Sequence, residues 1–259
     1  MGTPLKDWDI KINYGIKTGL NEAFIISGAK RNEILANCKS EDEKQRTDEL
    51  IRPILRGRDI KRFGYDWKNL WLINTHNGVK GKFPRIDIND YPAVKAHLDK
   101  YWAQLSNRED QGDTPYNLRN CAYLEDFSKP KVMWKIIGCN INFSFDENAM
   151  FCNNAVNIMT GERSQLLQFV GLMNSKLFDW YLKLTTEAEV QGGGIQLYVT
   201  TLEKTLLKLD FPETLCSIID NRINDNQYDD IVNDAIMDAY SLNNEEKKYI
   251  FMASQQEKL

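Results

Sequence analysis

The chain has 259 residues, of which 42% are hydrophobic, 27% charged and 11% aromatic, the composition of an ordinary globular protein. No apolar run approaches the ~20 residues of a membrane-spanning helix, and no signal-peptide pattern opens the sequence, so we expect no membrane partner. The five cysteines form no CxxC motif and only two histidines are present, which favours reduced thiols in a cytoplasm and argues against a zinc site.

The net charge of −4 hides an uneven distribution along the chain. Residues 210–259 hold eleven acids and four bases, a net −7, whereas residues 1–209 carry +3. Within residues 51–105, eleven bases and five acids give +6. This segregation suits an anionic partner that approaches one region while an acidic appendage faces elsewhere, although a merely solvated charged surface is an equal alternative.

The first predicted elements are two strands around a glycine-bracketed loop. Residues 1–6 resemble a cut end, so we expect a fragment of something longer. Apolar and polar residues alternate from Trp8 to Tyr14, as in a half-buried strand, and Ala23–Ile26 is predicted as the next strand. The loop Gly15–Gly19 between them carries Lys17 and Thr18. Glycines allow the backbone to lie against phosphates, but a plain hairpin also favours them.

The second informative segment spans residues 51–63, which contain one acid, Asp59, and a glycine turn at Gly57. Its five cations are Arg52, Arg56, Arg58, Lys61 and Arg62. Arginine forks can hold a phosphate or bind guanine bidentately, so the cluster can contact a nucleic acid. The alternative is an arginine ladder tied to local acids, with Arg58 and Asp59 capping the turn.

The middle of the chain alternates strands, loops and one helix. Strands are predicted over residues 67–73, 131–137, 140–145 and 151–159, and a polar loop over 74–89. Asp90 and Pro92 begin a helix that continues to residue 105. Lys131 and Lys135 fall on one face of their strand.

Residues 164–185 are predicted as the longest helix, central to the core, with Asn174 and Ser175 in its middle anchoring a neighbouring loop. The turn Gly192–Gly194 follows and leads into Gln196. It is either a flexible linker or a place where something passes close to the backbone. Three helices over residues 212–223, 228–240 and 244–255 form an acidic tail.

Several of these segments, in this order, resemble the TaqI-like C-terminal specificity domain, the DNA target-recognition part of N6-adenine methyltransferases and of Eco57I-like restriction enzymes. The segments are GIKTGLNEAFII from Gly15, IRPILRGRDIKRF from Ile51, FSKPKV from Phe127, LMNSKL from Leu172 and the triple glycine at 192–194. Thr205-Leu206-Leu207 departs from the family, which usually has a leucine-proline step there.

The resemblance implies that the chain binds double-stranded DNA and adjoins an upstream methyltransferase domain of the same polypeptide. The cofactor S-adenosylmethionine would belong to that domain, and none is expected in this chain. Side chains of the family's variable middle, here Arg108, Asn117, Arg119 and Asn120, would read sequence. The candidate DNA-binding residues are Lys17, Thr18, Gly19, Asn21, Arg56, Arg58, Lys61, Arg62, Lys131, Gly192, Gly193, Gly194 and Gln196.

The motifs of catalysis are missing. Adenine amino-methylation needs a Pro-Pro-aromatic step, and no two of the seven prolines are adjacent. No GxG stands between a strand and a helix, and no carboxylate cluster of a metal nuclease is evident. We therefore expect no catalytic and no metal-binding residue, and a chain that recognises DNA without cutting or methylating it.

The sequence predicts an α+β fold with mixed, mostly antiparallel sheets, packed helices and a small C-terminal helical subdomain. Residues 1–209 would form the specificity domain and residues 210–259 the acidic tail. Three alternatives remain: half of the specificity subunit of a multi-subunit restriction system, a protein-interaction module whose binding is indifferent to salt, and a free-standing enzyme.

Overall fold

The computed structural model describes residues 2–138, 140–185, 189–190, 194–208, 211–225 and 229–254. Its strands are β1 Thr3–Pro4, β2 Ile10–Tyr14, β3 Ile25–Ser27, β4 Ile51–Leu55, β5 Leu70–Ile73, β6 Lys131–Lys135, β7 Ile137–Gly138, β8 Phe143–Asp146, β9 Phe151–Cys152, β10 Val156–Gly161, β11 Glu189–Val190, β12 Gly194–Gln196 and β13 Leu206–Leu207. Its helices are α1 Asn21–Phe24, α2 Gly28–Ala36, α3 Glu41–Leu50, α4 Pro92–Leu98, α5 Trp102–Leu105, α6 Arg163–Met173, α7 Lys176–Thr185, α8 Val199–Lys204, α9 Glu213–Asn224, α10 Asp229–Ala239 and α11 Asn244–Ala253. The fold is α+β with mostly antiparallel pairing, which confirms the predicted class.

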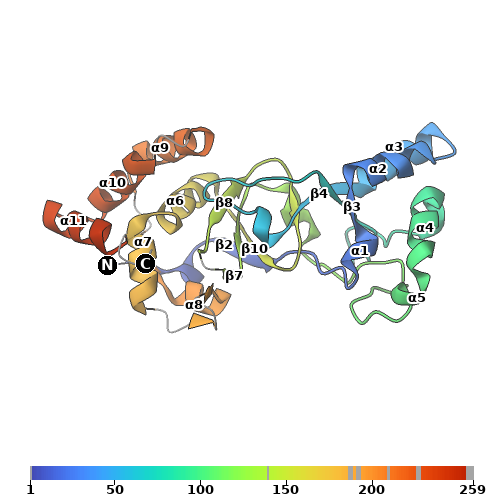
Figure 1. Ribbon diagram of the computed structural model, residues 1–259, viewed down its shortest axis with the longest axis horizontal. Helices are drawn as coiled ribbons and strands as arrows, with labels where there is room; N and C mark the ends of the chain where they lie inside the picture. Colours follow the sequence, from blue (N-terminus) through green and yellow to red (C-terminus); the bar gives the residue numbers. More distant parts are fainter. Residues whose placement is uncertain are drawn as a thin grey trace.

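The strands lie in the middle of an elongated molecule, with α1–α5 at one end and α9–α11 at the other (Figure 1). One four-stranded sheet has the order β2-β10-β6-β8, and a second has the order β3-β5-β4-β9. Every pair in these two sheets is antiparallel except β4–β9, which is parallel. Because β9 and β10 are joined by the short turn at residues 153–155, the chain passes directly from one sheet to the other.

The central strands β6 and β10 separate two hydrophobic cores. Val132, Trp134 and Met159 belong to the core shared with α6, whereas Met133 and Ile158 belong to the core shared with α1–α4. Successive side chains of a strand point to opposite faces, so a strand covered on both faces is apolar throughout. This explains why these two strands lack the apolar–polar alternation of β2.

Two predicted elements differ from the structure. Ala23–Ile26 was predicted as a strand, but α1 occupies Asn21–Phe24 and only Ile25–Ser27 pairs with β5. The expected helix over 164–185 is broken into α6 and α7 at Asn174 and Ser175. Asn174 anchors the chain at Phe143, as predicted, since its side chain accepts from the Phe143 N–H at 3.0 Å and donates to the Phe143 carbonyl at 2.7 Å.

The acidic tail packs on the long helices. Helices α9 and α10 contact α6 and bury Leu215, Ile219, Val232 and Ile236 in its core. Gly171 permits the close approach, because a Cβ there would lie 2.4 Å from Ile219 Cδ1. The tail thus shares a core with the preceding residues, and the boundary at residue 209 stays a prediction.

Candidate nucleic-acid interface

The Gly15–Gly19 loop lies against the turn between β9 and β10. The Ile16 N–H donates to the Cys152 carbonyl at 2.7 Å, and the Asn154 N–H donates to the Ile16 carbonyl at 3.0 Å. A Cβ at Gly15 would lie 2.0 Å from the Asn153 carbonyl oxygen, a separation that atoms do not tolerate. The glycine therefore sets how closely this loop packs on the turn.

The arginine-bearing turn reaches the same place from the other side. Strand β4 runs parallel to β9, and the Asn153 N–H donates to the Leu55 carbonyl at 3.0 Å. The turn Gly57–Asp59 follows, with Gly57 packed beside Ala155. Two segments that are forty residues apart in the sequence, to order of magnitude, thus flank one turn because a parallel strand pair brings them together.

Arg56 is fixed by a fork-to-fork pair with Asp59. Its Nε donates to Oδ2 and its Nη2 to Oδ1, both at 2.9 Å, and the Arg56 backbone N–H also donates to Oδ2 at 2.9 Å. Burial alone would raise the pKa of Asp59, but the hydrogen bonds from Arg56 outweigh it and leave this pKa below its ordinary value. Asp59 stabilises the turn as expected, but its partner is Arg56 rather than Arg58.

Two surface hollows meet at Asn154. One, of about 440 Å³, is lined by Tyr14, Lys17, Arg119 and Asn154 among others. The other, of about 560 Å³, is lined by Arg56, Gly57, Arg58, Lys135, Ile136, Ile137, Asn153, Asn154 and Ala155. We call the row formed by Lys17, Arg119, Asn154, Arg58 and Lys135 the Asn154 surface. It unites the two turns singled out in the sequence.

The cations of the Asn154 surface differ in how they are paired. Lys17 Nζ lies 2.9 Å from Asp110 and Arg119 lies 3.4 Å from the same carboxylate. The hydrogen bond from Lys17 is the main reason that the pKa of Asp110 falls below its ordinary value. In the part of the chain that the structure describes, neither Arg58 nor Lys135 forms an ion pair, so both are available to an anion.

The Gly15–Gly19 loop is tethered by buried Arg108. This guanidinium donates to the Thr18 and Asn117 carbonyls, and to the Pro115 carbonyl at 3.0 Å, and it lies 4.5 Å from the Phe24 ring centre. Burial lowers the pKa of Arg108 to about 10. Arg108, expected to read sequence, is therefore a support for the loop, and Asn117 is equally buried.

Two more predicted contacts are occupied elsewhere. The Thr18 side chain is only 2% exposed and its hydroxyl donates to Asn21 Oδ1 at 2.7 Å. Lys131 is wrong as a surface contact, because it is fully buried and its Nζ lies 2.5 Å from Asp146 Oδ2. A strand covered on both faces hides even its lysine, and Lys135 at the strand end remains accessible.

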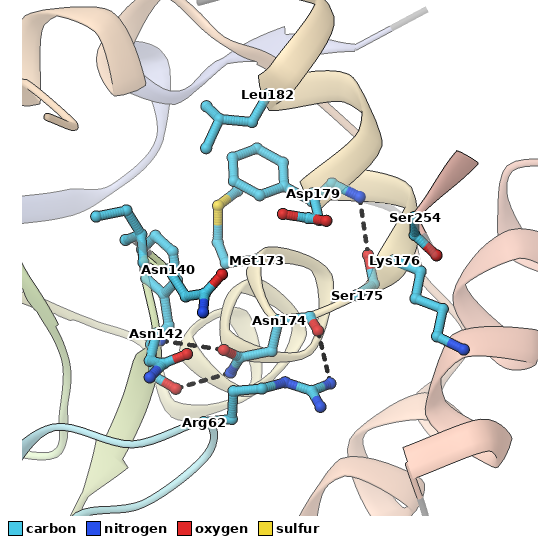
Figure 2. A pocket seen from close by; sticks show the side chains of 13 residues that line it. Arg62, Asn140, Asn142, Met173, Asn174, Ser175, Lys176, Asp179, Leu182 and Ser254 are labelled. Atoms are coloured by element: carbon cyan, nitrogen blue, oxygen red, sulfur yellow. Dashed lines mark hydrogen bonds between the residues drawn. The ribbon is translucent and has the colours of Figure 1, made fainter. Parts of the chain in front are cut away.

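Arg62 and Lys61 point away from the Asn154 surface. Arg62 donates to Asp229 at 2.9 Å and to the Asn174 carbonyl at 2.8 Å, beside a separate hollow of about 270 Å³ (Figure 2). Lys61 Nζ donates to the Arg58 carbonyl at 3.1 Å. The arginine-rich segment thus divides, with Arg56 and Arg58 on the surface of interest and Arg62 on the side of the tail.

The glycine-rich turn is described only at its end. Gly192 and Gly193 lie outside the described residues, whereas Gly194 begins β12. Gln196 pairs with Ile137 of β7, and Ile137 lines the hollow beside Arg58. Strand β12 therefore borders the Asn154 surface. Gly19, with φ of +68°, and Asn21 border it from the other loop.

Sequence reasoning missed the turn at residues 153–155 and placed no role on Lys135. The signal was present as two consecutive asparagines before a strand, residues that favour turns. Among the described residues, no helix is both long and apolar enough to cross a membrane. Within the same residues, no group of three or more His, Cys, Asp or Glu side chains could hold a metal ion.

Comparisons with known proteins agree with this architecture. Two solved structures share the fold: the type IIL restriction-modification enzyme MmeI, solved in complex with DNA, and the type IIG restriction endonuclease BpuSI. MmeI matches with a TM-score of 0.64 and 13% identity over 98% of this chain, and BpuSI with 0.51 and 12% over 86%. This chain spans 36% of MmeI and 26% of BpuSI.

A family model for the TaqI-like C-terminal specificity domain matches residues 52–206. The match covers more than half of the chain, and the chain belongs to this family, as its motifs suggested. The Gly15–Gly19 loop precedes the matched residues. A search of curated proteins finds no match to the sequence.

Proposed function

We propose that this chain is the DNA target-recognition domain of a restriction-modification enzyme, and that it binds duplex DNA through the Asn154 surface. In the whole enzyme it would position an adenine for a methyltransferase domain outside this chain, which would use S-adenosylmethionine. Membership of a specificity-domain family and the fold shared with MmeI support the proposal. The observation that carries it is the meeting of the two turns at Asn154.

The chemistry of the Asn154 surface suits this role. Arg58 and Lys135 offer charges that no described acid neutralises, and they would contact backbone phosphates and set position on the duplex. Asn154 is exposed, and its amide has the donor and acceptor needed to read a base edge. Each good bidentate pair supplies ~1–3 kcal/mol of discrimination between bases. The pair of Arg56 with Asp59 keeps the turn rigid, so little entropy is lost on binding.

Titration of labelled duplex DNA into the 259-residue chain tests the proposal. Fluorescence anisotropy between about 50 and 200 mM salt gives the affinity and the salt slope. The double variant R58A/K135A should bind more weakly and lose about 2 from the slope, about 1 for each phosphate contact. The control K6A/K248A changes the net charge equally at exposed lysines outside the Asn154 surface.

The control should bind like the wild type. Equal binding by R58A/K135A and the control would overturn the assignment of the Asn154 surface. Absence of salt-dependent DNA binding by the wild type would overturn the proposed function and favour a protein-interaction module.

A further inference from the structure

A rigid basic turn continues the Asn154 surface, in a region that the sequence indicated only as a polar loop. The backbone reverses at Val79–Phe83, where the Val79 N–H donates to the Phe83 carbonyl at 3.0 Å and the Phe83 N–H donates back at 3.2 Å. We call residues 79–85 the basic hairpin. It contains Lys80, Lys82 and Arg85 and no acid.

The basic hairpin is held at its base by His76. The Phe83 ring packs edge-on against the imidazole, with 5.0 Å between ring centres, and the Gly78 N–H donates to His76 Nδ1 at 3.2 Å. Gly78 has a φ of +75°, and a Cβ there would lie 2.6 Å from the Arg85 nitrogen. The turn therefore has a defined position before any ligand arrives.

The basic hairpin is contiguous with the Asn154 surface. It lines a hollow of about 790 Å³ together with Asn77, Asp113, Asn120 and Cys121. Asn120 and Cys121 also line the hollow beside Lys17. The Asn77 amide joins the two, since it donates to Asn120 Oδ1 at 2.5 Å and to Asp113 Oδ1 at 2.9 Å.

The hairpin offers anion-binding groups that are not used within the described structure. Lys80 and Arg85 are exposed and form no ion pair with any described residue, whereas Lys82 pairs with Glu125. Gly81, at the tip, has a φ of +79° and nothing within 4 Å of the position of a Cβ. A backbone without a side chain in open space can approach a phosphate closely.

We propose that the basic hairpin binds backbone phosphates of the same DNA duplex, beyond the Asn154 surface, and fixes the register of the domain without reading bases. Lys80 and Arg85 supply the charges, and Gly81 gives the phosphate room at the tip. This inference rests on the proposed function, since it requires DNA on the neighbouring surface.

The test compares K80A/R85A, R58A/K135A, the control K6A/K248A and the wild type on two duplexes of unrelated sequence. K80A/R85A should weaken binding to both duplexes equally and lower the salt slope by about 2. Circular dichroism of each variant shows that the fold is retained, which is expected because both hairpin side chains are exposed.

Each outcome separates the two proposals. If R58A/K135A binds more weakly but K80A/R85A behaves like the control, the hairpin inference is overturned and the proposed function stands. If K80A/R85A weakens binding to only one duplex, the hairpin reads sequence and the phosphate role is overturned. If the wild type fails to bind either duplex in a salt-dependent way, both proposals are overturned.

Discussion

Arg62, in the loop after β4, and Asp229, the first residue of α10, form an ion pair of 2.9 Å across the interface between the sheets and the acidic tail. Asp229 also accepts from Arg222, and both guanidinium groups lie over the Phe63 ring, at 5.5 Å for Arg62 and 4.5 Å for Arg222. One carboxylate thus joins the tail to the arginine-rich segment. The tail fixes the far end of the segment whose near end carries Arg58.

Asp229→Ala should lower the free energy of unfolding by ~1–3 kcal/mol, because charge-assisted hydrogen bonds from two arginines are lost in a half-buried place. Urea unfolding followed by circular dichroism measures the change. The matched control is Asp230→Ala, whose exposed side chain has no described partner and which should change stability by less than about 0.5 kcal/mol. Equal effects of the two substitutions would show that Asp229 does not join the tail to the sheets.

Gly15→Ala should destabilise the chain by ~1–3 kcal/mol and weaken DNA binding, because the added Cβ must displace the Asn153 carbonyl 2.0 Å away. Gly64→Ala is the control, since nothing lies within 4 Å of its Cβ position. Both properties are measured on the same samples by urea unfolding and anisotropy. If Gly15→Ala binds DNA and unfolds as the control does, the loop does not need its close packing on the 153–155 turn.

Lys131→Met should cost ~3–5 kcal/mol of stability, because it leaves the fully buried Asp146 carboxylate without its cation. Lys129→Met, three residues after the Asp126 with which it pairs at the surface, should cost ~0–1 kcal/mol. Thermal or urea unfolding distinguishes the two. Near-equal costs would mean that Lys131 is accessible to water, and it would return to the candidate contacts.

The two histidines predict a loss of stability in mild acid. Burial is the main cause that lowers the pKa of His76 and of His97 below the ordinary 6.5. The native state therefore holds fewer protons than the unfolded state below that pH, so stability is complete above pH 6.5 and decreases as the pH falls through 6.5 toward the lowered values. Protonation also removes the acceptor that His76 offers to Gly78.

Urea unfolding at a series of pH values measures this loss, with H76Q/H97Q as the comparison. The variant should show a flatter profile between pH 6.5 and the region near 3.8 where aspartates begin to titrate. An unchanged profile would place the pH dependence in other groups.

Local patterns predicted most elements of the fold. The alternation in β2, the apolar runs of β6 and β10 and the capping residues Asn243 and Glu246 of α11 lie where the sequence indicates. The break between α6 and α7 was not predictable, because the apolar pattern continues through it. Its cause is the hydrogen bonding of Asn174 to Phe143, a tertiary contact that no window of sequence contains.

The candidate site was predicted in its parts and not in its assembly. Both turns were visible as glycine- and arginine-bearing segments, but their common neighbour at residues 153–155 depends on the parallel β4–β9 pair. Lys131 and Lys135 share a strand face and still differ, since Asp146 on the neighbouring strand buries only the first. Pairing between distant strands, rather than propensity, decides these points.

Photo-crosslinking tests the location of the DNA most directly. A photoreactive phenylalanine analogue placed at position 154, or at position 248 on α11 as control, is irradiated with labelled duplex DNA. The Asn154 surface predicts a crosslink from position 154 that competing duplex removes, and none from position 248. Crosslinking from position 248 without any from position 154 would contradict the account.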